Sequence, residues 1–208
     1  MRNALGAFIL TVFAAAQIAF AGGTAETAIA TARQSLNAAE AQLGPEHPVT
    51  AMMMRELALA FEQGGYHNYA EQYATRAIGV LEARFGPRDV TLVPALNVLV
   101  EAFLAEGRNS DALACAMRAV EIGPDAGAHY GTALHNAGGA LFANGRVAES
   151  EEYFRRALAV RQATLPAGHP YIDATRAELK KVLKAAKMPS WHQRPHSTES
   201  ASLTSPTR

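Results

Sequence analysis

Three segments of the chain align without a gap, and the columns that they share decide the fold. They are residues 65–80 (GYHNYAEQYATRAIGV), 107–122 (GRNSDALACAMRAVEI) and 145–160 (GRVAESEEYFRRALAV). Each segment begins with glycine, has a small residue at the sixth position and has an Arg-Ala pair at the twelfth and thirteenth. The segments are offset by 42 and 38 residues, which indicates an internal repeat.

A second block of sequence precedes each of these segments. In it, large apolar residues recur three, four and seven positions apart, which is the spacing of one face of a helix. The three blocks are residues 54–61, 96–103 and 134–141. Stretches with glycine or proline, such as LGPEHP at residues 43–48, connect the repeats, and these residues end and begin helices. Each unit is therefore predicted to be a helix, a glycine turn, a second helix and a loop.

Composition excludes several classes of protein. The chain has 208 residues, of which 49% are hydrophobic, so it is too apolar for a disordered protein and long enough for one compact array. Its 19 basic and 19 acidic residues balance, which argues against a nucleic-acid binder. Aromatic residues make up only 7%, and the abundance of alanine favours helices over strands. A single cysteine, Cys115, excludes an intrachain disulfide and a cysteine metal cluster.

The N-terminal segment has the pattern of a secretory signal peptide. Arg2 is followed by an uncharged run over residues 4–21, which ends in the small-x-small sequence Ala19-Phe20-Ala21. We expect residues 1–21 to be removed near Ala21 and the mature protein to be periplasmic or secreted. The alternative is an uncleaved membrane anchor, because the run is close to the shortest length that spans a bilayer. The small residues at its end favour cleavage, after which no strong membrane insertion is expected.

The repeat resembles the tetratricopeptide repeat (TPR) family, and in particular the longer repeats of kinesin light chains. The resemblance is carried by LGPEHP at residues 43–48, GRVAE at 145–149 and YFRRALAV at 153–160. It implies an all-α fold, a right-handed α-solenoid of stacked antiparallel helix pairs over residues 24–186. Three full repeats are expected at about residues 49–86, 90–123 and 126–165, with a half-repeat at each end. The remainder, residues 187–208, is rich in serine, threonine and proline and is expected to be a disordered tail.

Two features depart from the family pattern. The linker at residues 122–125 is about four residues shorter than the others and lacks their histidine. Gly138 and Gly139 lie together inside an expected helix. Gly138 falls in a column where the family places a small residue for close packing. Gly139 has no such role and should cost about 1 kcal/mol relative to alanine.

Candidate catalytic and metal-binding groups have structural explanations. His47 and His169 share a column in the linkers, which favours a structural role. His192 and His196 are four residues apart, but they lie between and after prolines, where no stable helix is expected to hold a metal. Cys115 lies among apolar helical residues and is predicted to be a buried, unreactive thiol. No GxSxG, HExxH or phosphate-binding glycine loop occurs. The sequence predicts no enzyme, no cofactor and no metal.

The resemblance also implies a binding surface. In TPR proteins, the first helix of each unit lines a concave groove that binds peptides or extended partner segments. The family's groove positions correspond here to Arg55, Asn97, Glu101, His135 and Lys181. The family commonly places asparagine at the column of Asn97 to hold the backbone of a ligand, since an amide both donates and accepts hydrogen bonds. Arg55 and His135 replace it in the neighbouring repeats. Further positions of the groove are Met52, Leu59, Glu62, Leu104, Thr132, Phe142 and Lys184.

These observations lead to one main hypothesis and two alternatives. The main hypothesis is a non-catalytic interaction module of an exported protein, which binds a peptide or partner segment in the groove. The first alternative is a structural, self-assembling scaffold in the cell envelope. The second is attraction to an anionic surface through the basic residues of the last helix, which a solvated capping helix explains more simply. Those residues are Arg176, Lys180, Lys181, Lys184 and Lys187. The sequence identifies neither the partner nor the oligomeric state.

Overall fold

A computed structural model describes residues 24–187, and the predictions for the signal peptide and for the tail beyond Lys187 lie outside the described residues. Within that range the chain forms α-helices and two short 3-10 turns, with no strand. The elements are α2 (Ala25–Leu43), α3 (Pro48–Gln63), α4 (His67–Phe85), η1 (Val90–Leu92), α5 (Val93–Ala105), α6 (Asn109–Ile122), η2 (Pro124–Ala126), α7 (Ala128–Ala143), α8 (Val147–Thr164) and α9 (Pro170–Ala186).

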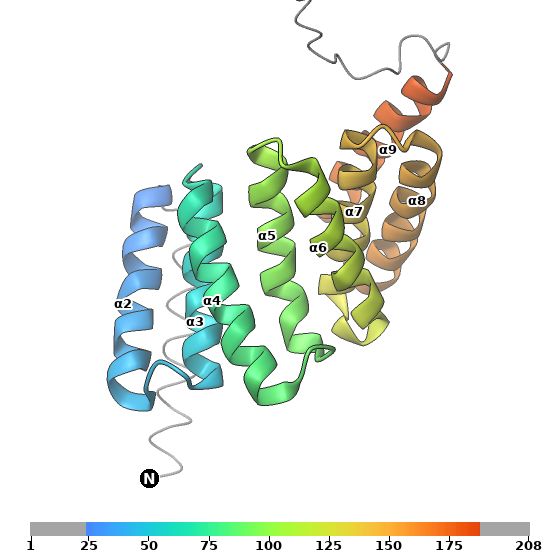
Figure 1. The fold of residues 1–208 in the computed structure, drawn as a ribbon. Coiled ribbons are helices and arrows are strands. Elements are labelled where there is room, and N and C mark those ends of the chain that lie inside the picture. Colours follow the sequence, from blue (N-terminus) through green and yellow to red (C-terminus); the bar gives the residue numbers. More distant parts are fainter. Residues whose placement is uncertain (1–23, 188–208) are drawn as a thin grey trace, which may run out of the picture.

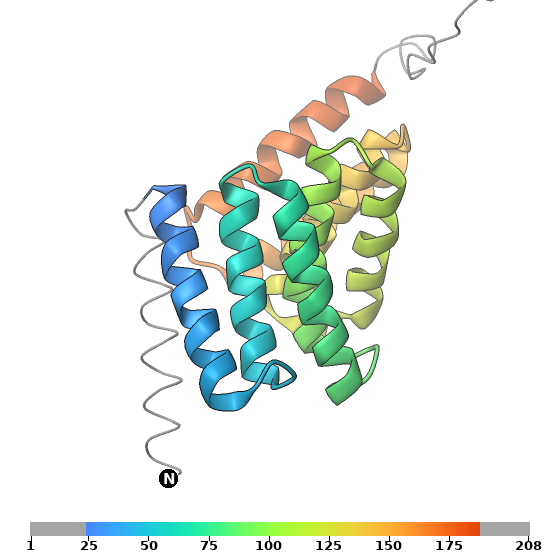
Figure 2. The same ribbon diagram turned by 60° about the vertical axis from the view of Figure 1, so that its left-hand side comes forward.

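The helices form two layers of stacked antiparallel pairs (Figures 1 and 2). The pairs are α3 with α4, α5 with α6 and α7 with α8, and each second helix also packs on the first helix of the next pair. The first helices α3, α5 and α7 contact one another in sequence and make up one layer. The last helix, α9, packs mainly on α8 and runs obliquely to the others (Figure 2). The prediction of an all-α solenoid is confirmed.

The shared glycine column makes the turn within each pair. Gly65, Gly107 and Gly145 have φ angles of 78°, 74° and 76°, a left-handed conformation that only glycine adopts without strain. The next amide in each case donates to a carbonyl five residues earlier, for example Tyr66 N to Phe61 O at 2.9 Å. This is the Schellman arrangement that ends a helix. The same type of hydrogen-bonded turn thus connects the two helices in each of the three pairs.

The linker histidines cap the helices that follow them. Nδ1 of His47 accepts a hydrogen bond from the amide of Val49 at 3.1 Å, and Nδ1 of His169 accepts one from the amide of Tyr171 at 3.2 Å. Each histidine lies directly before the first residue of a helix, which is a proline. The structural role predicted for these two histidines is therefore confirmed. In the linker between, Asp89 accepts from the amide of Thr91 in the same way.

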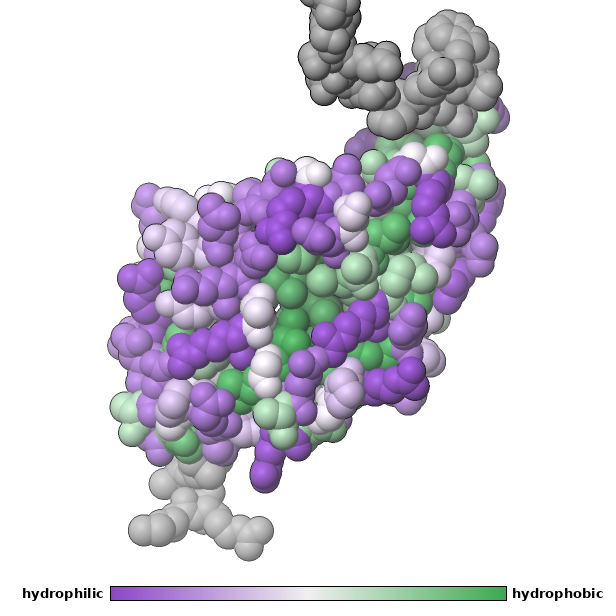
Figure 3. All heavy atoms as spheres, viewed as in Figure 1, coloured by the Kyte–Doolittle hydropathy of each residue, from purple (hydrophilic) through white to green (hydrophobic). Residues whose placement is uncertain are grey.

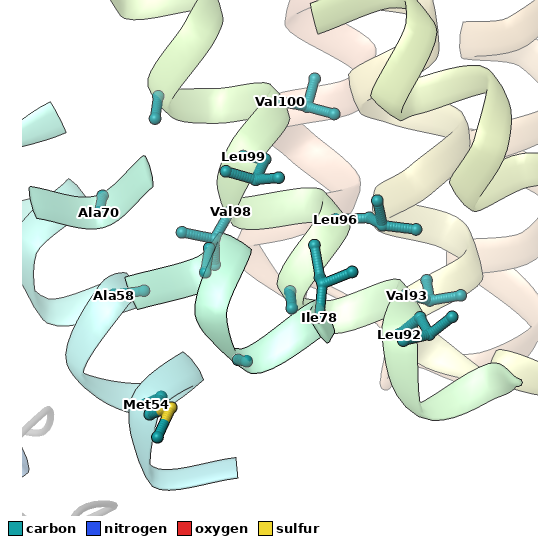
Figure 4. Close-up of a cluster of buried hydrophobic side chains, with 14 of the residues drawn as sticks. Met54, Ala58, Ala70, Ile78, Leu92, Val93, Leu96, Val98, Leu99 and Val100 are labelled. Carbon is teal, nitrogen blue, oxygen red and sulfur yellow. The ribbon is translucent and has the colours of Figure 1, made fainter. Parts of the chain in front are cut away.

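Small residues at the repeat columns let the helices approach closely. All six members of the two columns have an exposed fraction of 0%: Ala70, Ala112, Ser150, Ala77, Ala119 and Ala157. The larger side chains between them make a continuous core, in which Ile78 of α4 lies beside Leu92, Val93 and Leu96 (Figure 4). Ser150 also donates its hydroxyl to the carbonyl of Gly138 at 2.7 Å. The packing predicted for the small columns is confirmed.

Gly138 occupies the tightest of these contacts. A Cβ atom at this position would lie 3.0 Å from three ring atoms of Phe154, which is 1% exposed. The aromatic ring fills the space that a side chain on α7 would need. The interpretation of Gly138 as a close-packing residue is therefore confirmed.

Overpacking a small column should destabilise the array. We expect Ala119→Leu to lower the free energy of unfolding by about 1–3 kcal/mol, because a well-packed site has no room for three more carbons. Ala114→Leu is the matched control, since Ala114 is an exposed residue of the same helix. Denaturant melts of both variants measure the effect, and equal midpoints would contradict the assignment of the column.

The face shown in Figure 3 is mainly polar, with an apolar strip along α5 and α6 in its middle. Within residues 24–187, no helix combines the length and the hydrophobicity that a membrane span requires.

Candidate binding face

The first helices of the repeats leave one stripe of residues partly open. On α3, α5 and α7, the stripe has four positions per helix, and these positions are related by the repeat offsets of 42 and 38 residues. They are Met52, Arg55, Leu59 and Glu62 on α3, Pro94, Asn97, Glu101 and Leu104 on α5, and Thr132, His135, Gly139 and Phe142 on α7. We call this set the candidate face, and it includes four of the five predicted site residues. Except for Asn97, every member is partly or fully exposed.

The predicted role of Asn97 requires correction. Its side chain is only 4% exposed, and Nδ2 donates to the carbonyl of His129 at 3.1 Å. Asn136 in turn donates to the backbone carbonyl of Asn97 at 3.3 Å. The amide therefore links α5 to α7 and is not open to the backbone of a ligand. Because the group is buried, we expect Asn97→Ala to reduce stability as well, so this variant is not a clean test of binding.

Glu101 lies at the floor of the candidate face. Its Oε1 accepts a hydrogen bond from Nδ2 of Asn136 at 3.1 Å. Burial raises the pKa of the Glu101 carboxyl, and the negative charge of Glu62 raises it further, whereas the hydrogen bond from Asn136 and the positive charge of Arg161 lower it. Burial also raises the pKa of Glu62. The two carboxylates thus lie close enough to repel each other in a partly desolvated place, and Arg161 supplies a positive charge nearby.

His135 is held between α8 and α9. Its ring packs edge to face on Phe154, with a centroid separation of 5.2 Å, and Nδ1 lies 3.4 Å from the Thr175 hydroxyl. Burial lowers the pKa of His135 to about 4, and the positive charge of Arg161 acts in the same direction. The imidazole is therefore neutral at pH 7. The ring can therefore form hydrogen bonds at the candidate face, but it carries no charge there.

Arg161 is a residue that the sequence analysis missed. It is 4% exposed and reaches from α8 to α9, where its guanidinium donates to the carbonyl of Tyr171 at 2.9 Å and to the hydroxyl of Thr175 at 2.6 Å. Its stem fits because Gly131 has no side chain; a Cβ there would lie 3.1 Å from Cγ of Arg161. The cation ties the last helix to the preceding repeat.

Of the two remaining predicted site residues, Arg55 is partly exposed and Lys181 is exposed. Arg55 forms an ion pair with the adjacent Glu56 at 2.5 Å. Lys181, on α9, forms an ion pair with Glu178 at 2.5 Å. Lys181 lies on α9, which packs mainly on α8, so it is not part of the stripe on α3, α5 and α7. The structure thus places Arg55, Glu101 and His135 on the candidate face and Lys181 beyond its end.

Gly139 and its neighbours give the face an apolar part. A Cβ at Gly139 would meet only Cδ1 of Leu104, at an ordinary contact distance of 3.7 Å. Phe142, one turn further along α7, is 38% exposed. Leu104 and Phe142 thus give the candidate face two apolar residues in the same repeat column.

Filling the empty position should stabilise the folded chain. We expect Gly139→Ala to raise the free energy of unfolding by up to about 1 kcal/mol, because alanine has a higher helix propensity and the site has space for a methyl group. Thermal melts of the purified variant measure this. A lower midpoint than that of the parent would show that glycine is required for the fold at this position.

Other candidate groups are located as follows. Cys115 is partly buried, and burial raises the pKa of its thiol, so it is in the unreactive protonated form at neutral pH. Among the described residues, no cluster of three or more His, Cys, Asp and Glu side chains has the arrangement of a metal site.

The two layers, the repeated glycine turn and the capped linkers define a helical-repeat solenoid. Comparison with known proteins makes this more specific, because residues 131–171 match the family model described as tetratricopeptide repeat. This match covers most of α7, all of α8 and the following linker. None of the curated proteins compared with the chain is significantly similar to it.

Solved structures support the same assignment. BtubC (BKLC) from P. vanneervenii superposes with a TM-score of 0.70 at 20% identity, over 98% of this chain and 89% of that chain. The nearly identical TPR-like repeats of a Podospora anserina protein described as a kinesin light chain give 0.63 at 20% identity, over 88% and 86%. The apo form of RapI gives 0.67 at 13% identity, over 86% and 64%. The resemblance to TPR repeats of the kinesin light chain type is confirmed, and these identities support the fold alone.

Proposed function

We propose that this chain is an interaction module that binds a peptide or an extended segment of a partner protein along the candidate face. TPR repeats are generally non-catalytic and bind protein partners. The observation that carries the proposal is the stripe itself. In each of three helices whose other faces are largely buried, the same four columns lie on one side, and all but Asn97 remain accessible.

The chemistry of the stripe suits a peptide. It combines hydrogen-bonding groups such as His135, a carboxylate at Glu101 and an exposed aromatic ring at Phe142. A peptide presents amides, charged groups and apolar side chains in alternation, so all three kinds of contact can be used. Solenoids stack units of this type into an extended binding surface.

A matched pair of substitutions tests the proposal. Phe142 and Tyr69 are both exposed aromatic residues, at 38% and 54%, but Tyr69 lies on α4 in the other layer. The full chain is used to capture partners from its own source, and Phe142→Ser and Tyr69→Ser are compared quantitatively for each partner. We expect recovery to fall for Phe142→Ser and to stay unchanged for Tyr69→Ser. An equal effect of both substitutions, or of neither, would mean that the candidate face is not the binding surface.

We also propose that the protein is exported and acts outside the cytoplasm. This rests on Arg2, the uncharged run over residues 4–21 and the small residues at its end. N-terminal sequencing of fractionated cells should find a mature chain that begins near Gly22. An intact Met1 in the membrane pellet would contradict this proposal and indicate an anchored protein.

A further inference from the structure

A cavity lies outside the candidate face, at the end of the array that α2 forms (Figure 1). Its volume is about 520 Å³, and its lining includes Ile29, Ala30 and Arg33 of α2, Phe61 of α3 and Tyr66 of the following turn. We call this cavity the α2 pocket. Most of its lining is apolar and a few groups are polar, which is the usual character of a ligand site in a protein.

Close packing holds the aromatic walls of the α2 pocket in place. Phe61 is 5% exposed, and the ring of Tyr66 packs against it edge to face, with a centroid separation of 6.2 Å. Gly64 lets Tyr66 and Ile29 come close, since a Cβ there would lie 3.0 Å from Cδ2 of Tyr66 and 3.3 Å from Cδ1 of Ile29. Tyr66 nevertheless remains 48% exposed. The pocket is thus formed by the fold itself, and part of its aromatic wall is open to a partner.

The equivalent position of the next repeat is occupied by charged groups. Phe103 follows Phe61 by the repeat offset of 42 residues, and the guanidinium of Arg108 lies 4.1 Å from the centroid of its ring. This guanidinium donates hydrogen bonds to Glu71 at 2.7 Å and to Asp111 at 2.9 Å. In this repeat, an arginine on a phenylalanine ring is therefore paired with carboxylates of the chain itself.

The first repeat has a similar contact of arginine and ring without the carboxylates. Tyr66 stands in the column of Arg108, and Ile29 stands in the column of the glutamate that pairs with it. Arg33 of α2 supplies the guanidinium instead, at 5.9 Å from the centroid of the Phe61 ring. Arg33 forms no ion pair with any residue that the structure describes. The cation at the α2 pocket thus lacks the partner that its counterpart has.

The carboxylate among the described lining residues does not take this role. Glu26 lies seven residues before Arg33, which is about 10 Å along the helix axis. It belongs to the first turn of α2, where the helix dipole stabilises a negative charge. The α2 pocket therefore combines aromatic walls with a cation that has no carboxylate beside it. An occupant that complements both features has an apolar ring and a carboxylate.

We propose that the α2 pocket is a second partner-binding site, which takes an aromatic side chain and a nearby acidic side chain of a partner protein. The aromatic side chain packs on Phe61 and Tyr66. The carboxylate pairs with Arg33, as the carboxylates of the next repeat pair with Arg108. The pocket and the candidate face have no residue in common. Failure of either proposal therefore leaves the other in place.

Selection of peptides tests the chemistry of the occupant. The full chain is used to select from a library of random peptides, and the enriched peptides are measured again on two variants. Ala30→Phe places a ring in the α2 pocket, whereas Ala114→Phe makes the same change at an exposed alanine in the equivalent column of α6. We expect a group of peptides that binds about tenfold more weakly to Ala30→Phe and less than about twofold more weakly to Ala114→Phe.

The sequences of that group decide the proposal. Each should contain an aromatic residue close to an aspartate or glutamate. Circular dichroism melts show that both variants fold. If no enriched peptide distinguishes the two folded variants, the α2 pocket is not a binding site. A group that distinguishes them but contains no acidic residue would overturn the assigned chemistry.

The pairing with Arg33 is tested separately. Arg33→Gln should weaken a peptide of that group about fivefold, and it should leave unchanged a version whose acidic residue is replaced by the corresponding amide. Arg84→Gln is the matched control, because Arg84 is an exposed arginine at the far end of α4 that forms no ion pair with the described residues. It should affect neither peptide. The same loss for both peptides on Arg33→Gln would overturn the charge pairing.

A second copy of the chain is the other occupant that can be recognised. Sedimentation of the parent and of Ala30→Phe decides this, because the added ring would block self-association through the pocket. We expect both to be monomers under the conditions of the peptide measurements. A parent dimer that Ala30→Phe converts into monomers would show that the pocket takes another copy of this chain, and it would overturn the proposed partner.

Discussion

Phe154→Ala should lower the free energy of unfolding by about 3–5 kcal/mol, the range measured for large-to-small substitutions of buried aromatic residues. Phe154 is 1% exposed, and its ring lies against Gly138 of α7 and His135. It also belongs to the cluster with Leu179 and Val182 that holds α9. Removal of the ring therefore opens a cavity where three helices meet. Denaturant melts at 25 °C measure the loss.

The contact with Gly138 makes this prediction specific. Gly138→Ala alone should destabilise the chain, because the new methyl group would overlap the Phe154 ring by a few tenths of an ångström. In the Phe154→Ala background, the same substitution should become neutral or stabilising by up to about 1 kcal/mol, since the space is free and helix propensity improves. A double-mutant cycle measures this coupling. The same cost of Gly138→Ala in both backgrounds would contradict it.

The second large effect is the loss of stability in acid that His135 causes. In the folded chain the pKa of His135 is lowered to about 4, whereas the unfolded chain has the ordinary value of about 6.5. Between these values the unfolded state binds a proton that the folded state does not, so stability falls as the pH is lowered. Near pH 4, this difference in proton binding at His135 lowers the free energy of unfolding by about 3 kcal/mol relative to its value at neutral pH.

His135→Gln isolates this contribution. Glutamine keeps a group that can form a hydrogen bond with Thr175, but it does not titrate. As the pH falls from about 7 to 4, the free energy of unfolding of the parent should therefore decrease relative to that of the variant. Glu101 has a raised pKa and acts in the opposite direction, but it is present in both proteins and cancels in the difference. Parallel pH profiles for the two proteins would contradict the prediction.

The repeat columns predicted most of the fold because they record local requirements. A left-handed turn requires glycine, so Gly65, Gly107 and Gly145 mark the turns in the sequence itself. Close helix contacts require small residues, and Gly138 could be recognised for that reason. The linker histidines could be assigned a structural role because they share a column, although the capping hydrogen bonds themselves could not be predicted from the sequence.

Less of the candidate face could be predicted, because the hydrogen bonds and packing contacts of its residues involve groups that no sequence motif marks. Asn97 occupies the expected column, but its partner is the backbone carbonyl of His129, which no residue type indicates. Arg161 lies on a second helix, and nothing in the sequence around it indicates that this arginine is buried. It turns inward only because Gly131, thirty residues earlier, leaves a gap for its stem. Contacts between neighbouring repeats of unlike sequence are therefore the part that a column alignment misses.

Because α9 packs on a small separate cluster, we expect this helix to open locally at a lower free energy than that of global unfolding. The cluster of Phe154, Leu179 and Val182 is distinct from the main core, which runs from α2 to α7. In an array where each unit contacts only its neighbours, a terminal helix can open while the rest remains folded. Amide protons of α9 would then exchange with solvent through a local fluctuation, whereas those in the middle of α5 would require a larger cooperative unit to open. The end that carries Lys181 is thereby also the end at which the array can fray.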